Sequence, residues 1–186
     1  MIYYYHYHTY TIEIIESENN ITNISLLTHK SKKQNGVTII EVPSSIKQTI
    51  NWFDKYFSHK PLPATPPLSP SGTQFQMLVW NILQNVQYGE LVSYKYIGIR
   101  VANKLGKKNI SYQAIGQAIS RNPIAIIIPC HRVIKSNGKI GGYYWGTNIK
   151  EELIKHESIK MYLFSTQPNK YIFYIITSLL NLKSND

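Results

Sequence analysis

The sequence predicts an α+β protein of two domains: a small N-terminal β-sheet domain with a helix, joined to a mainly helical C-terminal domain. Three observations predict this fold: strand-like alternation in residues 2–41, helical spacing of apolar residues farther along, and a proline-rich stretch between them. A chain of 186 residues is long enough for one large or two small domains. We therefore expect an N-terminal domain over 1–60, a linker over 61–72, a second domain over 73–160 and a C-terminal extension over 161–186.

The first forty residues are rich in tyrosine, isoleucine and threonine, which favour strands. From His8 to Ile15, residues on one face alternate with threonine and glutamate, so we expect a strand there. The segment Glu18–Asn20 would turn the chain, Ile21–Thr28 would return, and Val37–Val42 would add a third strand. The tyrosine-rich start could also stack on bases, but packing within the sheet is the commoner use of such side chains.

A helix and a linker complete the N-terminal half. Apolar residues recur at helical spacing from Ile46 to Phe57, with Ser44 or Ser45 as the cap. Residues 61–70 then hold five of the chain's nine prolines and no charge. Proline lacks a backbone N–H, so this stretch is typical of an extended linker, although a proline-rich ligand for another domain is an alternative.

The second half begins with three capped helices. A one-faced helix is predicted from a cap at Thr73 to the turn at 88–89, a second from Ser93 to about Arg100, and a third from Ser111 to about Arg121. The last two, with the basic segment 102–109 between them, suggest a helix-turn-helix.

The predicted third helix has an outer face of small and polar residues, on which DNA could pack closely. An ordinary amphipathic helix with a solvated face is the alternative. The outward residues are Gln113, Gly116, Gln117 and Ser120.

The stretch 124–146, IAIIIPCHRVIKSNGKIGGYYWG, contains the only cysteine of the chain. Residues 125–128 read as a short buried strand that ends at Pro129 and delivers Cys130 to a turn. A second strand is expected over 133–140, reversing through an Asn-Gly turn. A cysteine here could simply be a small buried hydrophobe.

Chemistry at Cys130 would need a base, because only the thiolate is nucleophilic and a free thiol is a few per cent ionised at neutral pH. His131 follows directly. Neighbours on a strand point to opposite faces, but on a turn the two side chains can converge.

The composition of the chain limits the partners, covalent links and metal sites that can be expected. The excess of 20 Lys and Arg over 10 Asp and Glu gives a net charge of +10, which favours an anionic partner such as nucleic acid or a membrane surface. One cysteine excludes an intrachain disulfide and a multi-cysteine zinc site. No signal peptide is evident, and the apolar stretch Tyr171–Leu182, which we expect to be a helix, is too short to span a membrane. We expect a soluble, cytoplasmic protein without metal or cofactor.

The run IPCHRVI at 128–134 resembles the active-site signature of the O6-alkylguanine-DNA alkyltransferases. The resemblance covers roughly Thr73 to Glu157. Further matching segments are Arg121-Asn122-Pro123, Gly142-Tyr143, Trp145-Gly146, Tyr88-Gly89-Glu90 and Ser93-Tyr94.

The resemblance implies a role for each of five residues. Cys130 would accept the alkyl group, and His131 would deprotonate it through a bridging water. Glu157 would hydrogen-bond His131. Tyr94 would donate a proton to guanine O6, and Asn122 would hold the turn that presents the thiol.

It also implies a pocket and a DNA-binding surface. The family inserts an arginine from the recognition helix into the minor groove, and the matching position here is Gln113, which lacks the charge and the stacking plane. Lys104, Lys107 and Lys108 would contact phosphates, and Arg132 would hold the motif rather than touch substrate. The expected pocket residues are Val133, Tyr143, Tyr144 and Trp145, and the expected DNA contacts are Gln113, Gly116, Gln117, Ser120, Arg121, Lys107 and Lys108.

The function expected is direct-reversal DNA repair, in which one protein molecule transfers one alkyl group from O6-alkylguanine in double-stranded DNA to Cys130, with O4-alkylthymine as a second candidate substrate. We expect it to act as a monomer. A DNA-damage sensor without repair activity would share the helix-turn-helix and the charge, and Gln113 favours it mildly, whereas Cys130 argues against it. A cysteine hydrolase would share the side chains but would turn over repeatedly on acyl substrates.

Overall fold

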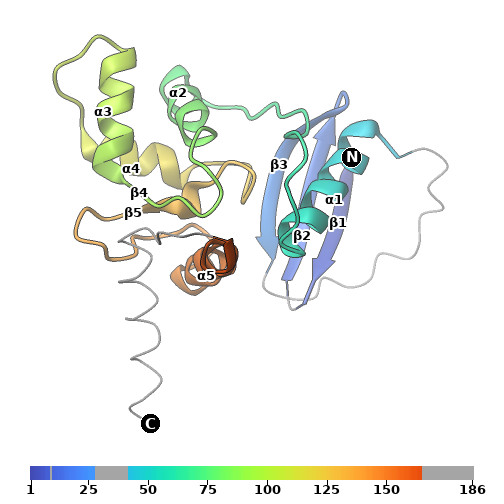
Figure 1. The fold of residues 1–186 in the computed structure, drawn as a ribbon. Helices are drawn as coiled ribbons and strands as arrows, with labels where there is room; N and C mark the ends of the chain where they lie inside the picture. The colour runs from blue at the N-terminus through green and yellow to red at the C-terminus, as the bar shows by residue number, and fades with distance from the viewer. Residues whose placement is uncertain (9, 28–41, 165–186) are drawn as a thin grey trace. The chain divides into compact units, whose positions relative to one another are not determined.

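The computed structural model describes residues 1–8, 10–27 and 42–164, with side chains described as far as Ser158. The chain forms two compact units (Figure 1). One comprises Met1–Gly72 together with Pro123–Ile127, and the other comprises Thr73–Asn122 together with the residues from Ile128 onward. The predicted α+β class is confirmed.

The first unit contains an antiparallel sheet in the order β1 (Ile2–Tyr7), β2 (Tyr10–Ser17), β3 (Asn20–Leu27). Glu18 and Asn19 join the last two strands with φ of +52° and +59°, and Ser17 pairs with Asn20. Two left-handed residues suit a two-residue hairpin, so the predicted turn at 18–20 is confirmed.

The predicted strand from His8 to Ile15 corresponds to β2, which begins two residues later, at Tyr10, and ends at Ser17. The chain reverses between Tyr7 and Tyr10, which pair with each other, and His8 has a φ of +49°. The alternating segment is therefore β2, and β1 precedes it. The predicted third strand at 37–42 lies largely outside the described residues.

Helix α1 (Ser44–Phe57) packs its buried side chains, including Phe53 and Tyr56, with the sheet. The predicted serine cap is wrong, because Ser44 and Ser45 lie inside the helix. Asn19 of the β2–β3 turn supplies the acceptor instead, taking the Ser45 backbone N–H at 3.0 Å. A long-range contact thus replaces the local cap.

The proline-rich segment is attached to the sheet of its own unit. The Ile21 N–H donates to the Pro67 carbonyl at 2.8 Å, and the Ser69 N–H donates to the Ile21 carbonyl at 2.8 Å. Residues 61–72 therefore cluster with the first unit in this structure.

The second unit is mainly helical and contains one short parallel pair of strands. Its helices α3 and α4 are the two predicted for the helix-turn-helix. The elements are α2 (Gln74–Leu83), β4 (Val92–Ser93), α3 (Tyr94–Lys104), α4 (Tyr112–Ser120), η1 (Cys130–Arg132), β5 (Val133–Ile134) and α5 (Thr147–Phe164).

The three predicted caps are confirmed. Thr73 forms a capping box with Gln76, Ser93 accepts the Tyr96 N–H at 3.0 Å, and Ser111 accepts the Ala114 N–H at 3.2 Å. Helix α3 runs one turn past its predicted end, to Lys104. Helix α2 stops at Leu83, several residues before the turn at 88–89 to which it was predicted to extend.

Close packing fixes α4 against its neighbours. A Cβ on Gly98 would lie 2.7 Å from the Tyr112 ring, so glycine lets α3 approach the start of α4. The Trp80 indole donates to the Ala118 carbonyl at 2.9 Å and joins α2 to α4.

The predicted buried strand before the cysteine is wrong in conformation but right in burial. Residues 124–128 are buried, yet only Ile124 forms a bridge, with Ile24, and the chain then turns. Ile126 has a φ of +66°, and the Ile127 N–H bonds the Ala125 carbonyl at 2.7 Å. These features end extended pairing. Farther on, Lys135 and Lys139 bond across the predicted Asn-Gly reversal, but Ile140 is not in a strand.

Candidate active site

Cys130 opens the short helix η1, and its side chain is 4 % exposed. The Asn122 side-chain amide donates to its Sγ at 3.1 Å and to the Ile128 carbonyl at 2.8 Å. Asn122 therefore bridges the chain on both sides of the buried turn and sets the position of the sulfur. The role that the family resemblance implies for Asn122, holding the turn that presents the thiol, stays a prediction.

His131 is fully buried and lies against Glu157 of α5, with Nε2 and Oε1 2.7 Å apart. A carboxylate accepts, so Nε2 carries the hydrogen. Among the described residues, Nδ1 has no hydrogen-bond partner. In this tautomer Nδ1 has a lone pair with which the imidazole can take a proton.

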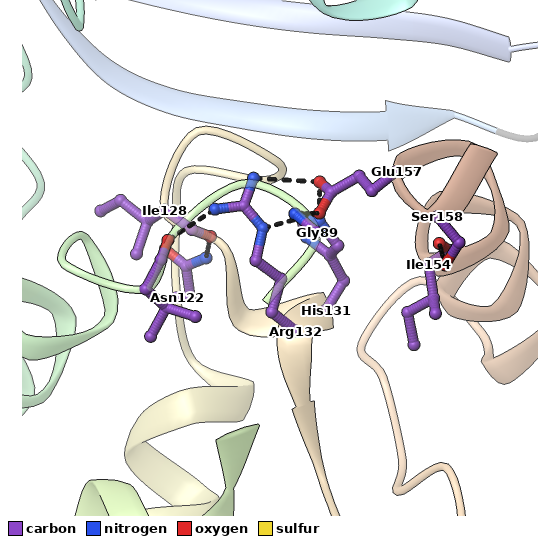
Figure 2. Close-up of polar contacts among 9 residues, drawn as sticks. Gly89, Asn122, Ile128, His131, Arg132, Ile154, Glu157 and Ser158 are labelled. Atoms are coloured by element: carbon purple, nitrogen blue, oxygen red, sulfur yellow. Dashed lines mark hydrogen bonds and ion pairs between the residues drawn. The ribbon is translucent and has the colours of Figure 1, made fainter. Parts of the chain in front are cut away.

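Glu157 receives further hydrogen bonds from Arg132 of η1 and from Gly89, which lies in the loop before β4 (Figure 2). Arg132 donates from Nε at 2.8 Å and from Nη2 at 3.0 Å, and the Gly89 backbone N–H donates at 2.9 Å. Arg132 also donates to the Val86 carbonyl at 2.7 Å. Arg132 thus holds the motif by hydrogen bonds, as predicted, and ties it to the segment after α2.

The protonation states follow from burial and charge. Burial raises the pKa of the Cys130 thiol, although the Asn122 bond and the Lys150 charge oppose that shift. Burial lowers the pKa of His131, against the effect of Glu157. Burial alone would raise the pKa of Glu157, but the interactions with His131 and Arg132 outweigh it and hold that pKa well below its usual range. The resting site therefore pairs a neutral thiol with a neutral imidazole and a carboxylate.

A small cavity of about 20 Å³ adjoins the sulfur. Burial raises the pKa of Tyr94, which keeps its hydroxyl protonated. A Cβ on Gly141 would lie 2.8 Å from the Tyr94 hydroxyl, so the glycine leaves space for it. The lining includes Tyr94, Gly116, Ser120, Cys130, Tyr143 and Tyr144.

Two of the predicted pocket residues do not line this cavity. The Trp145 ring packs on Tyr143 and Tyr144, with centroids 5.2 Å apart in each pair. Val133 is buried in β5, and its carbonyl is a hydrogen-bond acceptor. Trp145 therefore packs on two lining residues without lining the cavity itself.

Comparison of the chain with known proteins identifies its family. Residues 74–159 match the sequence model of the 6-O-methylguanine DNA methyltransferase DNA-binding domain. A methylated-DNA–protein-cysteine methyltransferase of Methanosarcina barkeri is 39 % identical over 141 residues, which are 76 % of this chain and 86 % of that protein. The chain belongs to the methylated-DNA–protein-cysteine methyltransferase family.

Two further relatives agree with this assignment. The methyltransferase of Methanosarcina mazei is 37 % identical over 148 residues, 80 % of this chain and 90 % of that protein. The crystal structure of Mycobacterium tuberculosis OGT in complex with DNA matches with a TM-score of 0.68 at 30 % identity, covering 84 % of this chain and 92 % of that one. The family and enzyme class predicted from the sequence are confirmed.

One buried residue of this methyltransferase site was missed by the sequence analysis. Lys150 of α5 is fully buried, and its Nζ donates to the Val133 carbonyl at 2.6 Å and the Gly142 carbonyl at 3.4 Å. Burial lowers the pKa of Lys150 to about 8, although Cys130 opposes the shift. The lysine joins the strand after the cysteine to the loop that forms the pocket wall.

The residues expected to bind DNA lie on α4, in the loop before it and, for Arg121, directly after its last residue. All are exposed except Gly116, which is half-buried and lines the cavity at Cys130. The exposed ones are Gln113, Gln117, Ser120, Arg121, Lys107 and Lys108.

The described residues contain neither a candidate membrane-spanning helix nor a cluster of metal-ligating side chains. No helix within them is long and apolar enough to cross a membrane. Within the same part of the chain, no three histidine, cysteine, aspartate or glutamate side chains are grouped to hold a metal ion.

Proposed function

We propose that the protein repairs DNA by direct reversal, moving the alkyl group of O6-alkylguanine in double-stranded DNA onto Cys130. The observation that carries the proposal is the hydrogen-bonded series from Glu157 to His131, next to the one cysteine of the chain. Family membership supplies the reaction class, and a chain with one cysteine has one thiol to accept the group.

In the proposed reaction, the neutral imidazole of His131 takes the thiol proton, either directly or through a water. The Cys130 sulfur then attacks the alkyl carbon, and the bond between that carbon and O6 breaks. The departing guanine takes a proton from Tyr94, which regains one from the imidazolium. The products are S-alkylcysteine and guanine. A thioether has no ready leaving path, so each protein molecule acts once.

Glu157 stabilises the imidazolium that forms, and Arg132 keeps Glu157 ionised. Asn122 holds the sulfur by a hydrogen bond that favours the thiolate. These three residues touch neither the alkyl group nor the base, so their proposed role is to position and charge the groups that do.

The base would enter the cavity between α4 and the loop 141–144. At about 20 Å³ the cavity is close to the size of one water molecule, so a flipped guanine requires the wall to move. Tyr144 is 76 % exposed and is the wall residue with the most freedom to swing outward.

Helix α4 would lie against the DNA, with Gln113 near the gap left by the flipped base. Gln117, Ser120 and Arg121 would contact the strands on either side. Lys107 and Lys108 would bind phosphates and add salt-dependent affinity.

We also propose that the protein acts as a monomer in the cytoplasm. The thiol, the imidazole and the carboxylate all come from one chain, so the chemistry needs no second copy. A single free cysteine suits a reducing compartment.

The proposal is tested by incubating the protein with a duplex that carries one O6-methylguanine, followed by intact mass measurement and peptide mapping. We expect each molecule to gain one CH₂ unit on the peptide with Cys130, and Cys130→Ala to gain none. Tight binding of the duplex without a mass gain would contradict repair and would favour the damage-sensing alternative.

A further inference from the structure

A second and larger cavity, of about 350 Å³, lies between α2 and α3. It shares no lining residue with the cavity at Cys130. Figure 1 shows the two helices in the second unit. The proposed repair reaction gives this cavity no role.

The cavity is cationic on the α3 side. Arg100 and Lys104 are four residues apart and so lie on one face of that helix. The Arg100 guanidinium lies over the Tyr96 ring, 4.3 Å from its centroid. This contact fixes the arginine at the cavity and leaves its N–H edge available to a ligand. None of the lining residues is acidic.

The rest of the lining is neutral. Ile82 and Val86 of the α2 side are buried and provide an apolar surface. Asn103 is exposed and presents its amide at the rim, whereas the exposed Asn85 donates from its amide nitrogen to the Asn81 carbonyl at 2.8 Å. Two cations, the Asn103 amide and an apolar surface fit a phosphate with its attached sugar, since guanidinium binds phosphate with two parallel hydrogen bonds and a deoxyribose is largely apolar.

We propose that this cavity binds one backbone phosphate and the adjoining deoxyribose of the DNA strand, outside the recognition helix. The inference rests on the proposed function in taking DNA as the ligand. Arg100, Lys104 and both asparagines are exposed, so a continuous strand can enter and leave without an enclosed space. Lys104 also lies on the last turn of α3, immediately before the basic loop that holds Lys107.

The contact can be located by removing charge from both partners. Single phosphates in a duplex with one O6-methylguanine are replaced by methylphosphonate, and affinity is measured with full-length protein carrying Cys130→Ala, so that the lesion persists. The same series is repeated with Arg100→Gln/Lys104→Gln. Lys47→Gln/Lys60→Gln removes the same charge from exposed positions elsewhere and serves as the control.

We expect one methylphosphonate position to weaken binding of the parent and of the control, but not to weaken the Arg100/Lys104 variant any further. Loss of one phosphate contact should also lower the slope of log K against log salt by about 0.9. The ratio of the parent's binding constant to that of the Arg100/Lys104 variant would then fall roughly 3.5-fold between 50 and 200 mM salt.

Asn103→Asp adds a negative charge at the rim of the cavity and should weaken DNA binding through the same phosphate. This single variant keeps the test valid if the double variant misfolds. Equal losses in all proteins at every phosphate would overturn the proposal. Binding of free deoxynucleoside monophosphate by the parent, without such a position on the duplex, would assign the cavity to a small molecule and would also overturn it. Because the assay reads DNA binding and not methyl transfer, its failure leaves the proposed function standing.

Discussion

Replacing Glu157 with glutamine tests how the buried network is stabilised. The carboxylate accepts hydrogen bonds from His131, from two nitrogens of Arg132 and from the Gly89 N–H, at 2.7 to 3.0 Å. Glutamine has the same shape but carries only one acceptor oxygen, and its NH₂ group would face another donor. Arg132, which is 5 % exposed, would keep its charge without the counter-ion.

The expected loss is large because one half of a buried ion pair is removed. Hydrogen bonds to charged groups contribute about 1.5–3 kcal/mol each, and breaking a buried pair from one side costs about 3–5 kcal/mol in total. We expect the free energy of unfolding of Glu157→Gln, measured by urea denaturation, to fall by about 3–5 kcal/mol. Glu152→Gln, an exposed site on the same helix, should change it by less than about 0.5 kcal/mol.

A double-mutant cycle separates a lost ion pair from a packing defect. Arg132→Met removes the orphaned charge, so the double variant with Glu157→Gln should be more stable than Glu157→Gln alone. A fall in the free energy of unfolding below about 1 kcal/mol in Glu157→Gln would refute the reasoning. So would a double variant whose free energy of unfolding falls by more than the two single losses added together.

The same residue predicts a pH dependence. The folded pKa of Glu157 lies well below its usual range, so its contribution is complete above the unfolded pKa of about 4.3 and is lost as pH falls toward the folded value. The wild type should therefore lose more stability than Glu157→Gln when pH is lowered from about 5 to about 3. Parallel curves would show that Glu157 is not stabilised as a carboxylate.

Three further changes probe the site. Lys150→Met removes a cation that favours the Cys130 thiolate and so raises the pKa of the thiol further, and single-turnover methyl transfer should therefore slow. Gly141→Ala places a Cβ 2.8 Å from the Tyr94 hydroxyl, so the ring must shift and transfer should slow. Adding Tyr94→Phe to the Gly141→Ala variant should slow transfer little further. Gln113→Arg restores the guanidinium of the family and should raise duplex affinity and the transfer rate, whereas an unchanged rate would show that glutamine supports base extrusion equally well.

Local rules predicted part of this fold well. Thr73, Ser93 and Ser111 cap helices through hydrogen bonds to residues three positions away, so sequence spacing was enough to find them. Ser44 looked like the same kind of signal, but the acceptor comes from Asn19 in a distant turn. The left-handed φ of Ile126 was also not foreseeable, because an isoleucine run favours an extended strand and only the tertiary structure imposes the turn.

In the candidate site, too, residues marked by a sequence signal were predicted, and a residue placed only by tertiary contacts was missed. Cys130, His131 and Glu157 were found because the family signature marks them, and the structure brings the last two together at 2.7 Å. Lys150 gave no such signal, since a lysine near glutamates on a helix is usually solvated. Its burial depends on the carbonyls of Val133 and Gly142, which approach it only in the folded chain.

The raised pKa of Cys130 has a consequence for a protein that acts once. Thiolates, not thiols, react with oxidants and stray electrophiles, so a buried thiol that stays protonated is protected until a substrate arrives. A strongly lowered thiol pKa would speed repair but would also consume the one acceptor in side reactions. In the proposed reaction, the network from Glu157 to His131 would resolve this conflict, because it would provide a base for the proton at the moment of transfer without ionising the sulfur in the resting state.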